Sequence, residues 1–270
     1  MSDLATRTAA PLVTAASRKL GIDLPADLAT ALAEADRVRS GRHLHHETPD
    51  VAAAVADAIL ANKDPLSSKD VHRAALAATL LDLNIDNRLD GHATKLAAAA
   101  LREHADAVID TWRPVVERIN AALQRFREHV PAGDPRADGL PTGLPAKALT
   151  PWGEAREALD KLDTIAQGWI ALANVGAPYA GGMNVTRPLI VADLNLEQLD
   201  SLGTNPKCPD VTRLDVPLEL ASTAAYAERV ARIQREKTQR QAYEAAAPER
   251  AREQRREQVR ASSRFAALIP

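Results

Sequence analysis

The chain has 270 residues and a formal net charge of −2, with 34 basic and 36 acidic side chains. This balance gives no whole-chain attraction to nucleic acid or to an anionic membrane surface. The single cysteine, Cys208, excludes an intramolecular disulfide, and no run of about 18 apolar residues is present for a membrane span. We therefore expect a cytoplasmic protein.

The composition predicts a mainly α fold with a thin core. Hydrophobic residues make up 46% of the chain but aromatic residues only 3%, and much of the apolar content is alanine. Alanine adds little buried area, so we expect helices that pack closely through Ala faces. The predicted architecture is a helical bundle with a long helix, a Pro/Gly linker, a second small helical part and a long charged C-terminal helix.

Residues 1–24 are expected to form a weakly ordered N-terminal segment, and residues 25–130 a helical domain. Pro25 begins the first helical pattern, because proline is favoured in the first turn. The sequence Thr48-Pro49-Asp50 begins the second helix, and Ser67 or Ser68 caps the third. We predict a turn over 83–91.

The clearest predicted helix runs from about His92 to Val130. From Val108 onward its large apolar residues recur mostly at steps of three or four, which gives a coiled-coil-like seam. This seam is typical of a core helix in a bundle, and we favour that interpretation over a specialised zipper. Pro114 predicts a kink or a break near Asp110.

Residues 131–151 hold five prolines and three glycines, which predicts a linker or an ordered crossover loop. A second helical part with an extended segment follows over 152–233. The stretch 185–194 has strand-like β-branched content, but Pro188 limits it to an edge strand or an extended arm. A small hairpin of 185–191 with 211–216 is one interpretation, although the sequence alone does not determine the fold of 176–216.

Residues 234–270 are predicted to form a charged C-terminal helix and tail. Its arginines are interleaved with glutamates, and pairs such as Glu236–Arg240 stabilise a helix without outside support. Phosphate binding favours cations without interleaved carboxylates, so we favour a solvent-facing helix over a nucleic-acid contact. Such a helix can present a charged face to a partner, and the candidate contact residues are Arg229, Arg232, Arg235, Arg240, Arg252, Arg255 and Arg256.

Two sequence patterns contain possible metal ligands, and each also has a simpler interpretation. His43, His45, His46 and Glu47 could bind zinc or nickel, but their spacing in a loop does not make the side chains converge. The acids of the DLNIDNRLDG stretch begin in register with a calcium loop, yet the closing glutamate is replaced by Ala93. Both segments are interpreted as solvated, and we predict no catalytic residue, cofactor or metal. The sequence leaves open whether the histidine loop has any role.

A resemblance to a group of known proteins rests on three stretches, AEADRVRSG, AALAATLLDLNI and LREHADAVIDTWRPVVERINAAL, together with the Pro/Gly break and the charged terminal helix. In these features the chain resembles Ala-rich helical proteins of unknown function from actinobacterial phages and prophages. The resemblance is one of style over about residues 25–130. It contains no residue-level motif, so it carries no functional residue over to this chain.

These features favour a non-enzymatic structural or assembly protein that acts through helix-mediated protein–protein contacts and is phage-derived if the resemblance holds. Acidic residues outnumber basic ones over 131–216 and the reverse holds over 217–270, which favours self-association or a protein partner. The alternative is a nucleic-acid-associated protein that uses the basic C-terminal helix. A third hypothesis is a metalloprotein that uses the histidine loop. The expected location is cytoplasmic, or the virion for a phage-encoded chain.

Overall fold

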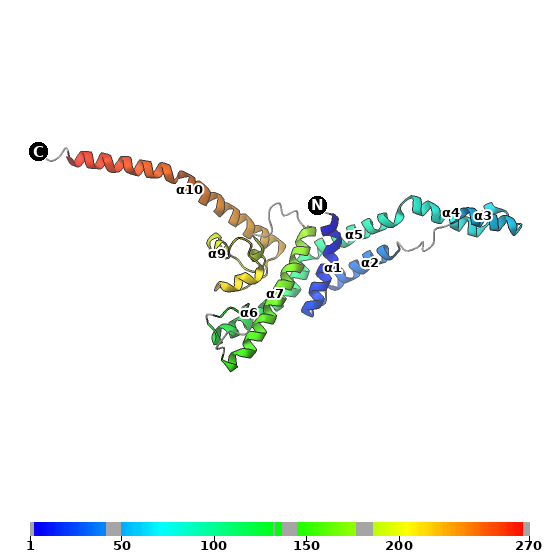
Figure 1. Cartoon of the computed structure of the whole chain (residues 1–270), viewed down its shortest axis with the longest axis horizontal. Helices are drawn as coiled ribbons and strands as arrows, with labels where there is room; N and C mark the ends of the chain where they lie inside the picture. Colours follow the sequence, from blue (N-terminus) through cyan, green and yellow to red (C-terminus); the bar gives the residue numbers. More distant parts are fainter. Residues whose placement is uncertain (1–2, 42–49, 132, 137–144, 177–185, 267–270) are drawn as a thin grey trace. The chain divides into compact units, whose positions relative to one another are not determined.

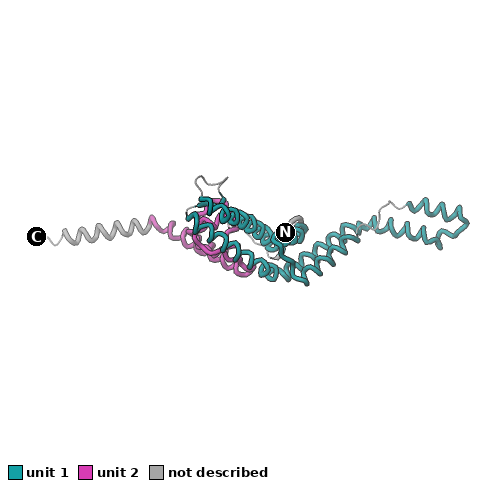
Figure 2. The backbone as a smooth tube through the Cα atoms, turned by 90° about the horizontal axis from the view of Figure 1, so that it is seen from below, with its two compact units in different colours: residues 1–181 teal, residues 182–270 magenta. Residues whose placement is uncertain are grey.

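The computed structural model describes residues 3–41, 50–131, 133–136, 145–176 and 186–266, of which 3–5 and 249–266 are described by their backbone alone. Every long element in these segments is an α-helix, and none of the described residues forms a strand, so the predicted mainly α class is confirmed. The chain divides into two compact units, Met1–Gly181 and Gly182–Pro270 (Figure 2). Each unit is described by itself.

Unit 1 contains the larger core. Its main elements, labelled in Figure 1, are α1 (Asp3–Leu20), α2 (Ala26–Ser40), α3 (Val51–Leu60), α4 (Lys69–Asp82), α5 (Ile85–Glu103), α6 (Ala105–His129) and α7 (Leu149–Gly176). Short 3-10 helices, η2 (Pro65–Ser67) and η3 (Ala146–Ala148), precede α4 and α7. Helix α7 packs along both α1 and α6, and the fully buried Trp112 and Trp169 lie in this three-helix layer.

Helix α1 corrects the expectation that residues 1–24 are weakly ordered. Ala9, Val13, Ala16 and Leu20 are buried at successive steps of four, three and four residues. This spacing places them on one face of a helix, which packs on α7. Pro11 lies inside the helix and did not end it. The N-terminal segment is therefore part of the unit 1 core.

A close helix contact holds α1 against α6 and α7. The indole Nε1 of Trp112 donates a buried hydrogen bond of 3.1 Å to Ser17 Oγ. Gly168 of α7 completes the contact, because a Cβ at this position would lie 2.7 Å from the Trp112 ring and 2.8 Å from the Cβ of Ala16. Glycine is required here by packing rather than by backbone conformation.

The remaining helices of unit 1 form two successive pairs, α2 with α5 and α3 with α4. Helix α2 begins after Pro25 as predicted, and Asp50 caps α3 by accepting a hydrogen bond from the Ala53 amide. The predicted turn over 83–91 is shorter than expected. Asn84 adopts a left-handed conformation with φ of 51°, and α5 begins at the next residue.

The predicted long helix of 92–130 is divided into α5 and α6 at His104. The break predicted near Asp110 is therefore misplaced, and Pro114 lies inside α6. The apolar seam is confirmed as a core face, with Val108, Trp112 and Phe126 buried in unit 1. A buried seam on a helix tolerates a proline because tertiary packing offsets the lost backbone hydrogen bond.

Unit 2 consists of short helices packed on the first part of a long one. Its elements are η4 (Arg187–Ile190), α9 (Leu196–Ser201), η5 (Cys208–Arg213) and α10 (Thr223–Ala266). The hairpin predicted for 185–191 and 211–216 is wrong, because no described residue of either stretch forms a strand and 187–190 and 211–213 lie in 3-10 helices. Their β-branched residues are explained by burial, since Ile190, Val191 and Val211 are core residues.

Candidate interaction surfaces

Arg229 anchors the first part of α10 to the rest of unit 2. Its side chain is only 7% exposed and donates hydrogen bonds to the carbonyl oxygens of Leu189 (3.0 Å) and Glu219 (3.2 Å). The carboxylate of Glu219 lies 3.2 Å from the same guanidinium. Burial lowers the pKa of Arg229, which the nearby carboxylates oppose. A cation buried in this way is both paired with carboxylates and hydrogen-bonded to carbonyl oxygens, so it contributes to the fold.

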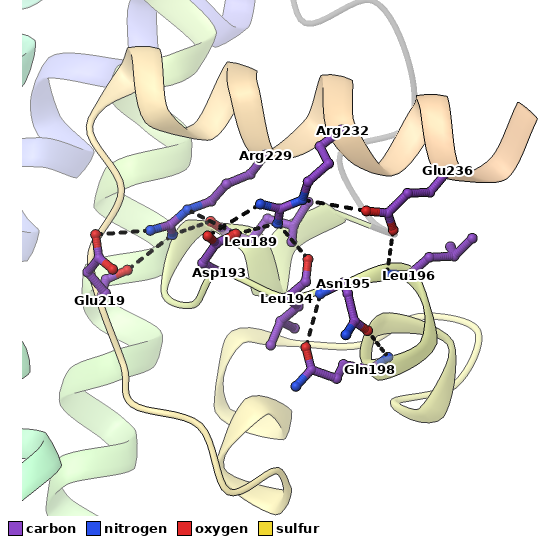
Figure 3. A network of polar contacts seen from close by, with 10 residues as sticks. All are labelled: Leu189, Asp193, Leu194, Asn195, Leu196, Gln198, Glu219, Arg229, Arg232 and Glu236. Atoms are coloured by element: carbon purple, nitrogen blue, oxygen red, sulfur yellow. Dashed lines mark hydrogen bonds and ion pairs between the residues drawn. The ribbon is translucent and has the colours of Figure 1, made fainter. Parts of the chain in front are cut away.

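One turn further along α10, Arg232 continues this network (Figure 3). Arg232 forms a two-pronged ion pair with Asp193 and donates a hydrogen bond of 2.9 Å to the Leu194 carbonyl. The hydrogen bond from Arg232 is the main cause of a lowered pKa of Asp193. Glu236 then accepts a hydrogen bond of 2.9 Å from the Leu196 amide at the start of α9.

Helix α9 is also capped from within its own sequence. The side chain of Asn195 accepts from the Gln198 amide at 2.9 Å, and Gln198 Oε1 accepts from the Asn195 amide at 3.0 Å. This reciprocal pair is a capping box, which orders the first turn of so short a helix. The side chains of Asp193, Asn195 and Gln198 therefore have defined structural partners.

Beyond this network, α10 leaves the short helices of unit 2. Arg240 pairs with Asp200 at 2.6 Å and with Glu244 at 3.2 Å, and residues 241–248 are all exposed. An open groove of about 810 Å³ lies between α9 and α10 at this point, with three acids, Arg240 and Tyr243 among its lining residues. The Tyr243 side chain is 67% exposed.

The structure separates the seven predicted contact arginines into three groups. Arg229, Arg232 and Arg240 form ion pairs within unit 2. Arg235 is exposed. The other three lie in α10 beyond residue 248, where side chains are not described, and they are Arg252, Arg255 and Arg256.

Sequence reasoning missed the acidic partners of these arginines. Asp193 lies 39 residues before Arg232, Asp200 lies 40 before Arg240, and Glu219 lies 10 before Arg229, so no helical spacing links these acids to α10. The available signal was the excess of acidic residues before 217 and of basic residues after it. Within unit 2, some of these acidic and basic residues form ion pairs with one another in the same chain.

A second exposed surface lies on the α3–α4 pair. Leu60 and Leu66 are each 81% exposed, and Ile59, Leu76, Leu81 and Leu83 are also exposed. Only Ala58 of α3 and Val71 of α4 are buried. Large apolar side chains are therefore concentrated on the exposed surface of a small element.

The other sequence candidates are placed elsewhere. His43, His45, His46 and Glu47 lie outside the described residues. Asp86 and Asp90 belong to helix α5, where Asp90 pairs with Arg39 at 3.3 Å, so the acids do not form a calcium loop. Among the described residues, no group of three His, Cys, Asp or Glu side chains is arranged to hold a metal ion. Cys208 is buried and its thiol donates to the Arg187 carbonyl.

Comparison with known proteins adds no relative: no family model, curated protein or solved structure matches the chain. Within the described residues, no helix combines the length and the apolar character needed to cross a bilayer.

Proposed function

We propose that this protein is a non-enzymatic assembly protein that binds a protein partner through the exposed part of α10. The supporting observation is the length of helix that continues beyond Arg240, the last residue of α10 whose ion pair with the short helices of unit 2 is defined. A helix of 44 residues extends about 66 Å at 1.5 Å per residue. A projecting helix of this kind reaches a partner without help from a pocket.

The side chains of the exposed stretch support a protein partner. Tyr243 presents an aromatic ring beside the α9–α10 groove, and aromatic side chains are enriched in the centres of protein interfaces. Residues 245–247 are alanines that allow close approach of a partner helix. Interleaved Glu and Arg residues keep the helix soluble and supply a polar rim.

The nucleic-acid alternative is less well supported. Three of the arginines proposed to bind phosphate are neutralised by Asp193, Glu219 and Asp200 inside unit 2. Each neutralised cation removes one potential phosphate contact, and affinity for nucleic acid scales with the number of such contacts. A cytoplasmic or virion assembly role, as the resemblance to phage proteins implies, remains our proposal for the setting.

The experiment is site-specific photo-crosslinking in cells of the source organism. Tyr243 is replaced by p-benzoylphenylalanine in the full chain, and the same substitution at Leu12, an exposed residue of α1, is the control. We expect a discrete protein adduct from position 243 that is absent from position 12 and resistant to nuclease. Equal adduct patterns from the two positions, or adducts that nuclease removes, would contradict the proposal.

A further inference from the structure

Helices α1 and α2, labelled in Figure 1, leave a cavity between them. Both helices pack on α5, whereas their direct contact with each other is slight. The space between them measures about 330 Å³, and α1, α2 and α5 all contribute to its lining. Alanines at the lining positions Ala10, Ala15 and Ala97 keep it open, because a methyl group fills little of the space between helices. The whole cavity lies within unit 1.

Part of the cavity lining is apolar. Pro11 of α1 and Leu32 of α2 line the cavity together with Ala97, which is only 5% exposed. Small-molecule sites commonly enclose about 300–1,000 Å³ and combine apolar walls with a few polar groups. The cavity is therefore large enough for a small molecule with an aliphatic part.

One of the two arginines that line the cavity already has its charge balanced. Arg39 donates to Asp36 at 2.6 Å and to Asp90 of α5 at 3.3 Å. Asp36 also lines the cavity, so this arginine and this carboxylate together leave no net charge there. Arg39 therefore holds α2 against α5 and is not a free cation.

Arg18 and Thr14 provide polar groups that the protein itself leaves unused. Within the described residues, Arg18 forms no ion pair and the Thr14 hydroxyl forms no hydrogen bond. By contrast, Thr30, Thr94 and Thr164 each donate to the carbonyl four residues earlier in their helices. Thr14 and Arg18 are four residues apart, hence on the same face of α1, and both line the cavity. A ligand in the cavity can therefore contact both groups at once.

The sign and size of the uncompensated charge define the class of ligand. Since Arg39 and Asp36 pair, Arg18 gives the lining a surplus of one positive charge. A carboxylate carries one negative charge and accepts two parallel hydrogen bonds from a guanidinium. A phosphate dianion would need a second free cation, which the lining does not supply. The lining thus fits a monocarboxylate.

We propose that this cavity binds a small aliphatic carboxylic acid. Its carboxylate accepts hydrogen bonds from Arg18 and Thr14, and its hydrocarbon chain lies against Pro11, Leu32 and Ala97. A cavity that holds only water would not distinguish an acid from its amide, because water adapts to donors and acceptors alike. Discrimination between these two ligands is therefore the property to measure.

The first test titrates the full chain with hexanoate and follows backbone amides by NMR. We expect saturable shifts concentrated in residues 10–18 and 32–39, with a dissociation constant of about 1 mM or tighter. Hexanamide, which has the same shape without the charge, should bind at least about 10-fold more weakly. Shifts that do not saturate by about 20 mM hexanoate, or equal affinity for the amide, overturn the proposal.

The second test compares variants of two neighbouring basic residues. Arg18→Gln should raise the dissociation constant of hexanoate at least about 10-fold, because it removes the charge-assisted hydrogen bonds. Lys19→Gln is the matched control, since Lys19 is also exposed in the last turn of α1 but does not line the cavity. Thr14→Val, which preserves the shape of the side chain, should raise the dissociation constant about threefold. Equal effects of Arg18→Gln and Lys19→Gln would mean that net charge attracts the acid without the cavity, and would overturn the proposal.

A carboxylate of this kind has two sources, a free acid and the C-terminus of a peptide. Titration with N-acetyl-alanyl-leucine, which ends in a free carboxylate, distinguishes them. Tighter binding of hexanoate supports the free acid. Tighter binding of the peptide, weakened by Arg18→Gln, would assign the cavity to a protein terminus and overturn the proposal.

The cavity goes beyond the proposed function and rests on different residues. It belongs to unit 1, whereas the crosslinking position Tyr243 lies in α10 of unit 2. Failure of hexanoate to bind leaves the crosslinking test unaffected, and a missing adduct at Tyr243 leaves the cavity proposal unaffected.

Discussion

Two glycines of helix α7 occupy opposite environments. Gly153 has open space around it, whereas a Cβ on Gly168 would lie 2.7 Å from the Trp112 ring. Alanine is favoured over glycine within a helix by about 1 kcal/mol, but overpacking a core costs about 1–3 kcal/mol. The sign of a glycine-to-alanine change should therefore depend on position within the same helix.

We predict that Gly168→Ala lowers the free energy of unfolding of unit 1 by about 1–2 kcal/mol, because the gain in helix propensity does not offset the clash with Trp112. Gly153→Ala is the matched control and should raise this free energy by up to about 1 kcal/mol. Urea denaturation followed by tryptophan fluorescence measures both, since all three tryptophans lie in unit 1. Equal effects at the two positions would show that the contact at Gly168 is not tight.

The ion pair of Asp193 with Arg232 predicts a pH dependence in unit 2. Arg232 holds the pKa of Asp193 below its ordinary value in the folded state. The stabilisation is therefore present above the unfolded pKa and is lost as pH falls through the folded pKa. We expect unit 2 to lose stability below about pH 4, because the ordinary pKa of an aspartate is about 3.9.

Urea titrations between pH 3 and 7, followed by NMR signals of Tyr226 and of the amides of 187–221, measure this effect. Asp193→Asn should reduce the fall in the free energy of unfolding of unit 2 at acid pH. Glu157, whose pKa Lys161 lowers through a hydrogen bond on the surface of unit 1, provides a control. Glu157→Gln should leave the unit 2 profile unchanged, and an unchanged profile for Asp193→Asn would refute the assignment.

At the scale of elements, α10 has two parts with different sources of stability. Up to Arg240 it is held by tertiary contacts, including the buried Tyr226, Arg229 and Ile233. Residues 241–248 are exposed, so the helix there depends on alanine content and on pairs such as Arg240–Glu244. The two parts should therefore respond independently to substitution.

We predict that changing Ala245, Ala246 and Ala247 to glycine melts the outer part of α10 and leaves unit 2 folded. Each glycine costs about 1 kcal/mol of helix propensity, and the three alanines are exposed, so buried packing does not offset the loss. Far-UV circular dichroism should report fewer helical residues, while the NMR spectrum around Tyr226 stays unchanged. A loss of unit 2 signals would mean that the outer part stabilises the unit.

Local signals in the sequence were sufficient for most helices. Pro25 and Asp50 mark helix starts because capping and first-turn preferences act over three or four residues. The α1 helix was missed because Pro11 and a thin Ala/Val stripe resemble a loosely ordered segment until α7 covers them. The 187–213 segment was misassigned because β-branched residues indicate burial and strand equally well.

The candidate surfaces also combine features that local sequence predicts with features that only the fold creates. The helical periodicity of α10 identified its arginines, but their partners Asp193 and Glu219 are brought close only by the fold of unit 2. The exposed surface of the α3–α4 pair carries an ordinary apolar pattern in sequence. Whether such a pattern is buried depends on tertiary contacts, and only the structure reveals that Leu60 and Leu76 remain exposed.

At the scale of the whole molecule, the charge distribution bears on our preference for a protein partner over nucleic acid. The chain is slightly acidic overall, and part of the positive charge of α10 is neutralised by carboxylates of unit 2. A nucleic-acid-binding surface requires clustered cations, since each phosphate contact contributes to affinity and to its salt dependence. Internal pairing removes several of the contacts that the sequence offered.

We therefore predict weak binding to nucleic acid, with dissociation constants above about 100 µM for duplex DNA and single-stranded RNA at physiological salt. Fluorescence anisotropy of labelled oligonucleotides measures this. Changing Arg252, Arg255 and Arg256 to glutamate should have little effect on the dissociation constant. The control is the same change at three exposed basic residues of unit 1, Arg88, Lys95 and Arg118, and it should have an effect at least as large. Binding tighter than about 1 µM that only the α10 reversal abolishes would instead establish the nucleic-acid function, because that outcome requires unpaired cations on the outer part of the helix.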